Sequence, residues 1–492
     1  MSWQKLDGRI VAALAILVLA PIVPTIAVML IAGAGADAVR NVAQVYSAIA
    51  ALLVLSRALE WYATSYRITD ERVELRSGVV SRNHRSLPRE RIRSVDLTAD
   101  PVHRLLGLAV VKIGTGAQGT GELKLDAVAR EEADRIRTEL LPSTSDGQDA
   151  PLARLNPAWL LYSAVTLSMM LAVWGAIASA FGSLSDVLQK FGLYGEIGEL
   201  FRSVPLWAGF GVPVAAVLLT GVLGAFLLSL ELWWDFTLTR EDSGTLRVRR
   251  GLLTRRSISL EEQRLRGVEV AEPLLLRWTG GARTNAIATG LSEQADGKNQ
   301  PDAKTLLPPA PRAQAMRVAA AVLREPESGE PEFPSTAEFR PHPRAALRRR
   351  LTWGSLSAAP FAAFGITAAA LGWIPWWLAV VVAALSVAVA AAFAVDAYRN
   401  LGHRLHGRFL LARRGSGLRR TVALQRSGII GWRFEQSLFQ RRAGLLDVVA
   451  TTAAGTGRCT VPDVAAGAGL EFAEQTVPGL VAPFLEPSHP ED

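Results

Sequence analysis

In this chain of 492 residues, arginines spaced two residues apart are the side chains most suited, by type and spacing, to bind a ligand. Arg89, Arg91 and Arg93 alternate, so all three would lie on one face of a β-strand. Such a face near a membrane could bind lipid phosphates or an acidic peptide, and each charge is worth about 1 kcal/mol at an anionic surface. The alternative is a solvated sheet face balanced by neighbouring acids. The candidate lipid- or partner-binding residues are Arg82, Arg85, Arg89, Arg91, Arg93, Arg255, Arg256, Arg264 and Arg266.

Signatures of catalysis and of metal binding are absent from the sequence. There is no G-x-x-x-x-G-K-[ST] phosphate loop, no G-x-S-x-G nucleophile elbow and no H-E-x-x-H zinc pair. The single cysteine, Cys459, excludes an intrachain disulfide and a cysteine-based zinc or iron–sulfur site. His403 and His406 have the spacing of a helical metal pair, but without a third ligand we expect surface histidines beside a membrane span. We therefore predict no enzyme, no cofactor and no metal.

Long uncharged stretches indicate a membrane protein. Half of the residues are hydrophobic and 20% are charged, and a helix needs about 20 apolar residues to cross a bilayer. The last uncharged stretch must form two spans, which divide at the tryptophan-rich residues 372–377. We therefore predict six spans in three hairpins, the second span being short. The uncharged stretches are residues 10–36, 41–56, 155–185, 203–230 and 351–395.

The basic residues indicate which side of the membrane holds the polar segments. Of the 53 lysines and arginines, only Arg40, Lys190 and Arg202 lie in the short turns between paired spans. Because cytoplasmic flanks carry the excess of Lys and Arg, we expect a plasma-membrane protein with both termini and all large segments in the cytoplasm. The run 348–350 is then the basic flank of the fifth span. The net charge of +8 is spread among acids along the chain, so no nucleic-acid partner is expected.

Three copies of one polar segment follow the three hairpins. GVVSRNHRSLPRERIRSV, from Gly78, aligns without a gap with GLLTRRSISLEEQRLRGV, from Gly251, 173 residues later. A third, degenerate copy begins at Gly415, another 164 residues on. An R-x-x-G follows in each copy, and we interpret it as a structural feature in which the arginine bonds a backbone carbonyl or a helix end. These repeat-defining residues are Arg104, Gly107, Arg277, Gly280, Arg441 and Gly444.

Each polar segment alternates polar and apolar residues as β-strands do, and ends in an amphipathic helix. In the first copy we predict strands over residues 66–69, 72–75, 89–95 and 109–113 and a helix over 127–141. The corresponding helix of the second copy is expected over 312–323, whereas the corresponding segment of the third copy, 464–477, is Gly-rich and degenerate. The fold class is thus a multi-pass α-helical membrane protein with three cytoplasmic β-rich domains, each a small sandwich or barrel with a capping helix.

The order of these residues resembles a known family, the membrane-flanked bacterial pleckstrin-homology-like (PH-like) domain proteins of the YdbT type. The resemblance covers essentially the whole chain and implies a PH-like fold for each copy, a bent antiparallel sandwich closed by a C-terminal helix. The third copy departs most, with Gln425 and Arg426 in the places of Pro88 and Arg89. The residues that carry the resemblance are Tyr66-Arg-Ile-Thr, Gly78, Leu87-Pro88, Arg91-Ile92, Val95, Arg104-x-x-Gly107 and Ile113.

The predicted domains alternate along the chain. Transmembrane hairpins occupy residues 1–60, 151–232 and 346–396. PH-like domains occupy residues 61–150, 233–345 and, in degenerate form, 397–480, and residues 481–492 form a tail.

The predicted function is non-enzymatic binding at the inner leaflet. The PH-like domains would bind membrane lipids or a membrane or cytoplasmic protein partner, for scaffolding or for protection against envelope stress or toxins. The predicted spans contain no ionisable residue, which argues against a carrier. One alternative is a subunit of an export or envelope-protection assembly, and another is a membrane hydrolase with an unrecognised site.

Overall fold

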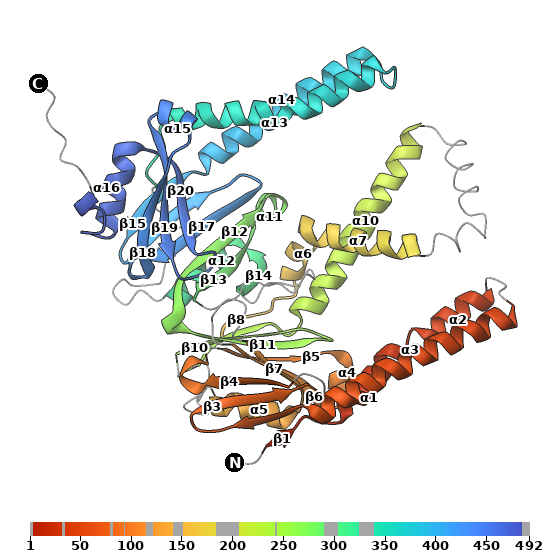
Figure 1. The fold of residues 1–492 in the computed structure, drawn as a ribbon. Coiled ribbons are helices and arrows are strands. Elements are labelled where there is room, and N and C mark those ends of the chain that lie inside the picture. Colours follow the sequence, from red (N-terminus) through yellow and green to blue (C-terminus); the bar gives the residue numbers. More distant parts are fainter. Residues whose placement is uncertain are drawn as a thin grey trace, which may run out of the picture. The chain divides into compact units, whose positions relative to one another are not determined.

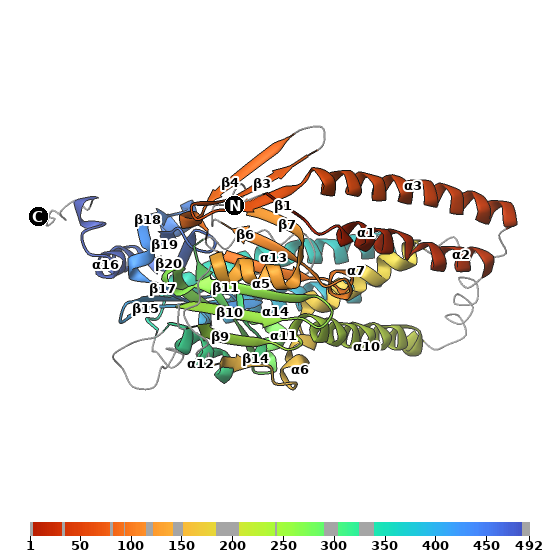
Figure 2. The ribbon, with the colours of Figure 1, turned by 90° about the horizontal axis from the view of Figure 1, so that it is seen from below.

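The computed structural model describes residues 3–31, 35–78, 82–92, 94–114, 122–140, 151–183, 206–241, 244–289, 304–323 and 339–484. The chain divides into two compact units (Figures 1 and 2). Unit 1 is Met1–Gln263 with Gln294–Ala303, and unit 2 is Arg264–Glu293 with Lys304–Asp492. The division between Gln263 and Arg264 falls inside the second repeat rather than between repeats.

The first hairpin consists of α1 (Arg9–Leu19), α2 (Ile22–Ile31) and α3 (Ala36–Ala63). Pro21 lies in the break between α1 and α2, because proline has no amide hydrogen to continue the helix. α3 extends well beyond the short uncharged stretch 41–56. Near its C-terminal end, Arg57 donates to the carboxylates of Glu60 (2.8 Å) and Asp126 (2.9 Å), so the charged turn is stabilised by ion pairs.

The other hairpin helices are less uniform. α6 (Trp159–Ala164) and α7 (Leu167–Ser183) are separated at Val165 and Thr166, and α10 (Leu206–Trp233) follows. In the third hairpin, α13 (Arg344–Ala370) and α14 (Trp376–Arg399) are joined by a turn at Gly372, whose φ is 75°. The predicted division of the stretch 351–395 at residues 372–377 is therefore confirmed.

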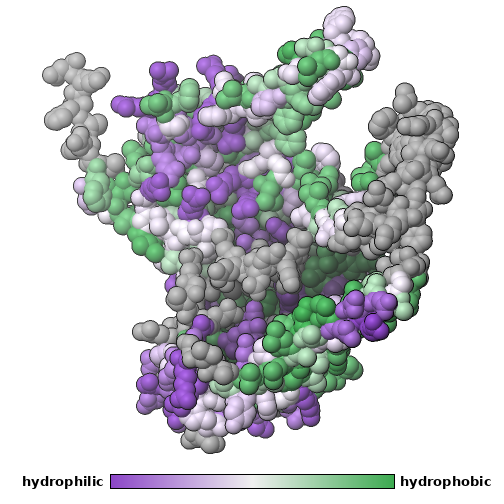
Figure 3. All heavy atoms as spheres, turned by 45° about the vertical axis from the view of Figure 1, so that its right-hand side comes forward, coloured by the Kyte–Doolittle hydropathy of each residue, from purple (hydrophilic) through white to green (hydrophobic). Residues whose placement is uncertain are grey.

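Four helical segments among the described residues are long and apolar enough to cross a membrane: Arg9–Ala27, Ala36–Ala63, Val214–Trp233 and Trp376–Arg399. Their large hydrophobic side chains are exposed, as in Leu219 (70%), and Figure 3 shows hydrophobic surface on the hairpin helices. The apolar part of α7, Leu167–Ser179, is shorter, and α13 contains Pro360 together with several Gly, Ser and Thr residues. Four of the six predicted spans thus correspond to such helices.

Unit 1 holds a four-stranded and a seven-stranded antiparallel sheet. Their strand orders are β1-β2-β3-β4 and β7-β6-β5-β11-β10-β9-β8. The strands are β1 (Gln4–Lys5), β2 (Ser65–Ile68), β3 (Arg72–Ser77), β4 (Asn83–Pro88), β5 (Ser94–Ala99), β6 (Leu108–Gly114), β7 (Glu122–Ala129), β8 (Pro151–Arg154), β9 (Thr237–Glu241), β10 (Thr245–Arg250) and β11 (Arg255–Glu261).

Unit 2 holds a six-stranded and a three-stranded sheet. Their orders are β14-β13-β12-β17-β16-β15 and β18-β19-β20. The strands are β12 (Leu265–Pro273), β13 (Gly281–Ala288), β14 (Thr305–Pro311), β15 (Gly402–His406), β16 (Phe409–Arg414), β17 (Leu418–Gln425), β18 (Ile429–Glu435), β19 (Leu445–Thr452) and β20 (Arg458–Ala465).

A helix closes each repeat, as predicted. These helices are α5 (Arg130–Leu140), α12 (Arg312–Leu323) and α16 (Ala466–Thr476). Ala133 and Ile136 of α5 are buried with Val111 and Leu123 in the core of the first repeat, and Phe472 of α16 is buried in the core of the third. The amphipathic pattern therefore identified the packing face correctly.

The strand predicted over residues 89–95 is wrong at its first half. Residues Arg89–Arg91 form a 3-10 turn, η1, and β5 begins only at Ser94. The same turn recurs as η2 (Glu262–Arg264) and η3 (Arg426–Gly428). Three residues are too few for the alternation of polar and apolar residues to distinguish a 3-10 turn, with three residues per turn, from a strand.

Neighbouring repeats share sheets, a point on which the sequence makes no prediction. β11 of the second repeat pairs with β5 of the first, and β17 of the third pairs with β12 of the second. Short helices precede the next strand in each repeat, namely α4 (Pro101–Leu105), α11 (Leu274–Trp278) and α15 (Leu438–Arg442).

Candidate functional site

Arg89 closes the first repeat and does not belong to a ligand-binding face. Its guanidinium donates to the backbone oxygens of Thr69 (3.3 Å) and Glu139 (2.5 Å). Glu139 lies in the last turn of α5, where a positive charge also stabilises the helix dipole. Arg426, at the equivalent position of the third repeat, donates to the backbone oxygen of Thr476 at the end of α16 (2.5 Å). The structure therefore gives this arginine a structural role.

The other predicted arginines of the first repeat do not form one row. Arg82 and Arg85 are exposed, just before β4 and within it. Arg91 is part of η1, and Arg93 lies outside the described residues. The predicted face of three arginines is not formed, because its first two members belong to a turn.

The predicted arginines of the second repeat lie near the strand pairs that join repeats. Arg255 and Arg256 begin β11 and pair with the end of β5, and burial lowers the pKa of Arg256. Arg264 ends η2. Arg266 lies on β12 against Gly428, where a Cβ atom would be 3.1 Å from its Cδ. Arg256, Arg264 and Arg266 are partly buried, whereas Arg255 is exposed.

Two of the R-x-x-G arginines, Arg104 and Arg277, make hydrogen bonds to later segments of the chain. Arg104 donates to the backbone oxygens of Leu252 and Leu253. Arg277 donates to the carboxylate of Asp396 at the end of α14 (2.9 Å). Each glycine has a positive φ that ends the short helix before it: 69° at Gly107, 75° at Gly280 and 65° at Gly444.

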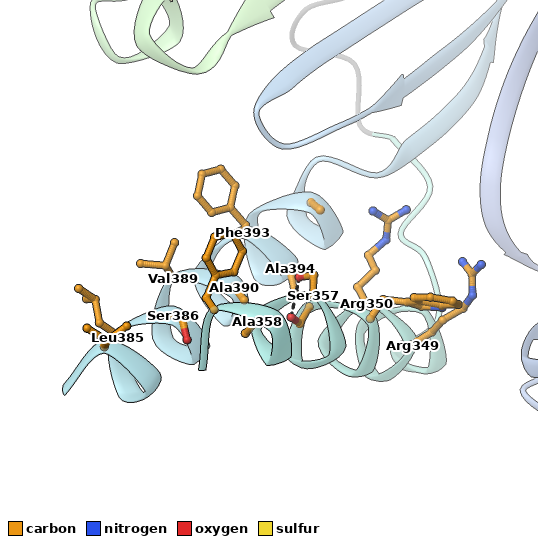
Figure 4. A pocket seen from close by; sticks show the side chains of 15 residues that line it. Arg349, Arg350, Ser357, Ala358, Leu385, Ser386, Val389, Ala390, Phe393 and Ala394 are labelled. Atoms are coloured by element: carbon orange, nitrogen blue, oxygen red, sulfur yellow. Dashed lines mark hydrogen bonds between the residues drawn. The ribbon is translucent and has the colours of Figure 1, made fainter. Parts of the chain in front are cut away.

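A groove of about 870 Å³ runs between α13 and α14 of unit 2 (Figure 4). Small residues let the two helices approach, since a Cβ atom on Gly354 would lie 3.0 Å from the backbone oxygen of Ala390. Phe361 and Phe393 line the groove and are 66% and 43% exposed. The groove is therefore apolar and open to the surroundings of the hairpin.

Two arginines stand at one end of this groove (Figure 4). Arg349 and Arg350 both donate to the carboxylate of Asp463, Arg350 at 3.0 Å. Asp463 is fully buried and has a φ of 58°. Within the described part of the chain, the buried Nε atoms of both arginines make no hydrogen bond. Two guanidinium groups thus share the Asp463 carboxylate at the mouth of an apolar groove.

Asp447 and Gln440 hold the buried carboxylate in place. The Gln440 amide donates to Asp447 (2.6 Å) and to Asp463 (3.2 Å), and the backbone N–H of Asp463 donates to Asp447 (2.8 Å). Burial, with a contribution from the charge of Asp463, raises the pKa of Asp447. The network fixes Asp463 and, through it, the two arginines.

His403 is buried, although a surface position was expected. It lies on β15, not on a helix, so residues three apart point to opposite faces and His403 and His406 cannot form a metal pair. The His403 ring instead meets the ring of His342, with centroids 5.0 Å apart. The described residues contain no group of three or more His, Cys, Asp or Glu side chains that could hold a metal ion.

Burial lowers the pKa of both histidines to about 4. Near His342, Asp463 raises the pKa and Arg350 lowers it, while Arg340 lowers the pKa of His403. Both rings are therefore neutral at pH 7.

A second pocket, of about 320 Å³, lies at the base of the first hairpin in unit 1. Its charged residues are Arg57, Glu60, Lys124 and Asp126. Asp126 pairs with Arg57 (2.9 Å) and with Lys124 (2.7 Å). Because these charges compensate one another, this pocket is a weaker candidate than the groove between α13 and α14.

Sequence reasoning missed the groove and its arginine pair. Residues 348–350 were interpreted as the basic flank of a span, and nothing local joins them to Asp463 more than 110 residues away. The available signal was an acid between apolar neighbours in β20, Val461 and Pro462 before it and Val464 and Ala465 after it, since a buried carboxylate requires a partner.

Comparisons with known proteins agree with the repeat architecture. A family model described as the bacterial PH domain matches residues 11–144, 187–325 and 361–476. The UPF0699 transmembrane protein YdbT of Bacillus subtilis (strain 168) is 22% identical over 423 residues, which cover 80% of this chain and 81% of that protein. No solved structure matches the chain.

Proposed function

The chain belongs to the bacterial PH-domain family, and on this premise we propose that it is a non-enzymatic membrane scaffold that binds an anionic phospholipid of the inner leaflet. Its four candidate spans and its transmembrane relative agree that it is a membrane protein. We propose further that six spans cross the plasma membrane and that both termini and the PH-like repeats lie in the cytoplasm.

The observation that carries the lipid proposal is the groove between α13 and α14 with Arg349 and Arg350 at one end. An acyl chain fits an apolar groove that is open along a membrane hairpin. A lipid phosphate fits beside two guanidinium groups that share one carboxylate, because arginine binds phosphate through several N–H donors. The arginines precede the first uncharged residue of the hairpin, at Leu351, which is the depth of lipid headgroups.

Lipid retention on the purified full-length protein tests this proposal. After delipidation, phosphatidylglycerol and phosphatidylcholine are titrated separately and bound lipid is counted by native mass spectrometry. Arg350→Gln removes one positive charge while Arg349 still pairs with Asp463, and Ser386→Phe fills the groove. We expect each to lower phosphatidylglycerol retention about fivefold, as for the loss of roughly 1 kcal/mol.

Matched controls lie next to the changed residues. Arg348→Gln removes a neighbouring exposed charge, and Val387→Phe adds the same ring at an exposed position that does not line the groove. Both are expected to retain lipid as the unchanged protein does. Equal binding of the two lipids, or normal retention by the Arg350 and Ser386 variants, would contradict the lipid site and favour a protein partner.

A further inference from the structure

Neighbouring repeats are joined by the same antiparallel strand pair, which we call the repeat junction. It consists of β5 with β11 in unit 1 and of β12 with β17 in unit 2. Ala99 lies opposite Arg255, and Glu272 lies opposite Arg419. The sequence offsets of 173 and 164 place Ala99 on Glu272 and Arg255 on Arg419. The two junctions therefore have the same register.

The second junction shows what stabilises this contact. Seven residue pairs lie opposite each other along β12 and β17. Arg419 donates to both oxygens of Glu272, at 2.7 and 2.6 Å, and Glu272 is only 1% exposed. Arg104 and Arg277 add a contact from each repeat to the following one. Backbone pairing, a two-point ion pair and an arginine contact thus act together.

At each end of the series of repeats lies one strand of the kind that forms a repeat junction, without the strand that would pair with it among the described strands. β4, which corresponds to β11 and β17, ends the four-stranded sheet, and β18, which corresponds to β5 and β12, ends the three-stranded sheet of the described strands. Arg441, which corresponds to Arg104 and Arg277, is exposed. Leu438 and Phe439 of the same short helix are 78% and 63% exposed.

We propose that β18 of one copy pairs with β4 of a second copy in the register of the repeat junction. The pair Val270–Thr421 corresponds by the sequence offsets to Phe434 opposite His84. A second copy fits this edge because it carries the complementary half of a contact that the chain already makes twice. Each repeat follows a membrane hairpin, so copies added in this way stay at one depth and form a ring or a row in the membrane plane.

This contact between copies is weaker than the junctions within the chain. Pro88 removes a backbone donor from β4. Arg433 stands where β12 has Glu269, and the register places it opposite Arg85, a like-charge pair. Assembly is therefore reversible, and Arg433→Glu strengthens it by restoring the acid.

Disulfide crosslinking of the full-length protein in native membranes tests the register. Two differently tagged chains are co-expressed, one with His84→Cys and the other with Phe434→Cys. The native Cys459 is buried, and burial raises the pKa of its thiol to about 12, so it does not react. Oxidation is expected to give mixed-tag dimers, and Arg433→Glu is expected to raise their yield about two- to fivefold.

Three controls accompany this experiment. Leu97→Cys with Ser257→Cys is the equivalent pair of the first junction and must crosslink within one chain. Ile430→Cys replaces Phe434→Cys as an off-register control and is expected not to crosslink with His84→Cys. Ser386→Phe is expected to leave the dimer yield unchanged, which separates failure of this proposal from failure of the lipid site.

Four outcomes would overturn the proposal. The first is an equal yield of dimers from Ile430→Cys and from Phe434→Cys, and the second is that His84→Cys chains form dimers with each other alone. The third is that no dimers form although the Leu97–Ser257 control crosslinks. The fourth is that one chain carrying both cysteines forms a disulfide within itself and no mixed-tag dimer appears.

Discussion

Asp463 combines complete burial with two arginine partners, a combination whose net effect on stability depends on how well hydrogen bonds compensate the buried charges. Gln440 and the neighbouring Asp447 supply the remaining contacts. Removing either arginine leaves the carboxylate with one cation, whereas removing both leaves a buried charge unpaired. For this reason a single arginine substitution is the appropriate probe of the groove, and Arg350 is preferred because Arg349 remains in place.

The neighbouring histidine pair predicts a loss of stability in mild acid. Burial lowers the pKa of His342 and of His403 from 6.5 to about 4, so the unfolded chain binds protons first as the pH falls. The stability that these rings contribute is therefore complete above pH 6.5 and is lost between about pH 6.5 and 4, on the order of 3 kcal/mol for each ring. Thermal unfolding of the full-length protein measured from pH 7.5 to 4.5 checks this.

Two variants separate this effect from general acid unfolding. His403→Phe keeps a ring for the edge-to-face contacts with His342 and Phe472 but cannot be protonated, so its melting temperature is expected to fall less steeply with pH. His84→Phe changes an exposed histidine and is expected to follow the unchanged protein. An identical pH dependence in all three proteins would show that the buried rings are not responsible.

At the level of secondary structure, the helix that closes a repeat is held at its C-terminal end by an arginine from the 3-10 turn. Arg89 does this for α5 and Arg426 for α16. In the second repeat the equivalent residue is Glu262, which pairs with Arg240, and Arg408 donates to the backbone oxygen of Leu323 at the end of α12 (2.8 Å). The contact is thus kept although the residue that makes it changes.

Loss of this contact is expected to loosen α5. Arg89→Ala removes hydrogen bonds from a charged donor to the oxygens of Thr69 and Glu139, which are worth about 1–3 kcal/mol. Hydrogen exchange of the amides of residues 130–140 is expected to speed up accordingly, while lipid retention stays unchanged. Arg82→Ala, at an exposed position, is the control and should change exchange very little. Unchanged exchange in Arg89→Ala would mean that α5 is held by its buried face alone.

At the level of the whole molecule, α7 and α13 decide how the chain crosses the membrane. The apolar part of α7 is too short to cross on its own by length, since a helix rises about 1.5 Å per residue and the hydrocarbon core is about 30 Å thick. Its flanking residues would have to complete the span. The excess of basic residues in the large segments favours three full hairpins over four isolated spans.

Reporter fusions are expected to resolve this topology. Alkaline phosphatase joined after residues 36, 193 and 373 should be active, because these positions would lie outside the cell. Fluorescent protein joined after residues 140 and 340 should fluoresce in the cytoplasm. Alkaline phosphatase activity at 140 or 340 would overturn the orientation, and fluorescence at 193 or 373 would show that the preceding helix does not cross.

Local patterns in the sequence predicted much of the fold. The helix over 312–323 agrees with α12, because amphipathic spacing is set within one helix. The strand expected at Arg89 and the surface position expected for His403 were wrong, because each depends on residues far apart in the chain. The contact of Arg349 and Arg350 with Asp463 could not be predicted for the same reason, since a basic residue near a span does not indicate which buried acid it contacts.

The shared sheets also limit where this chain can be cut. Excision of residues 233–345 as a free-standing domain would leave β11 and β12 with unpaired edges, and such edges promote aggregation. A protease site or a split reporter introduced between Gln263 and Arg264 would instead leave every sheet of the two units whole. For fragment complementation, the 3-10 turn inside the second repeat is therefore a better division point than the border between repeats.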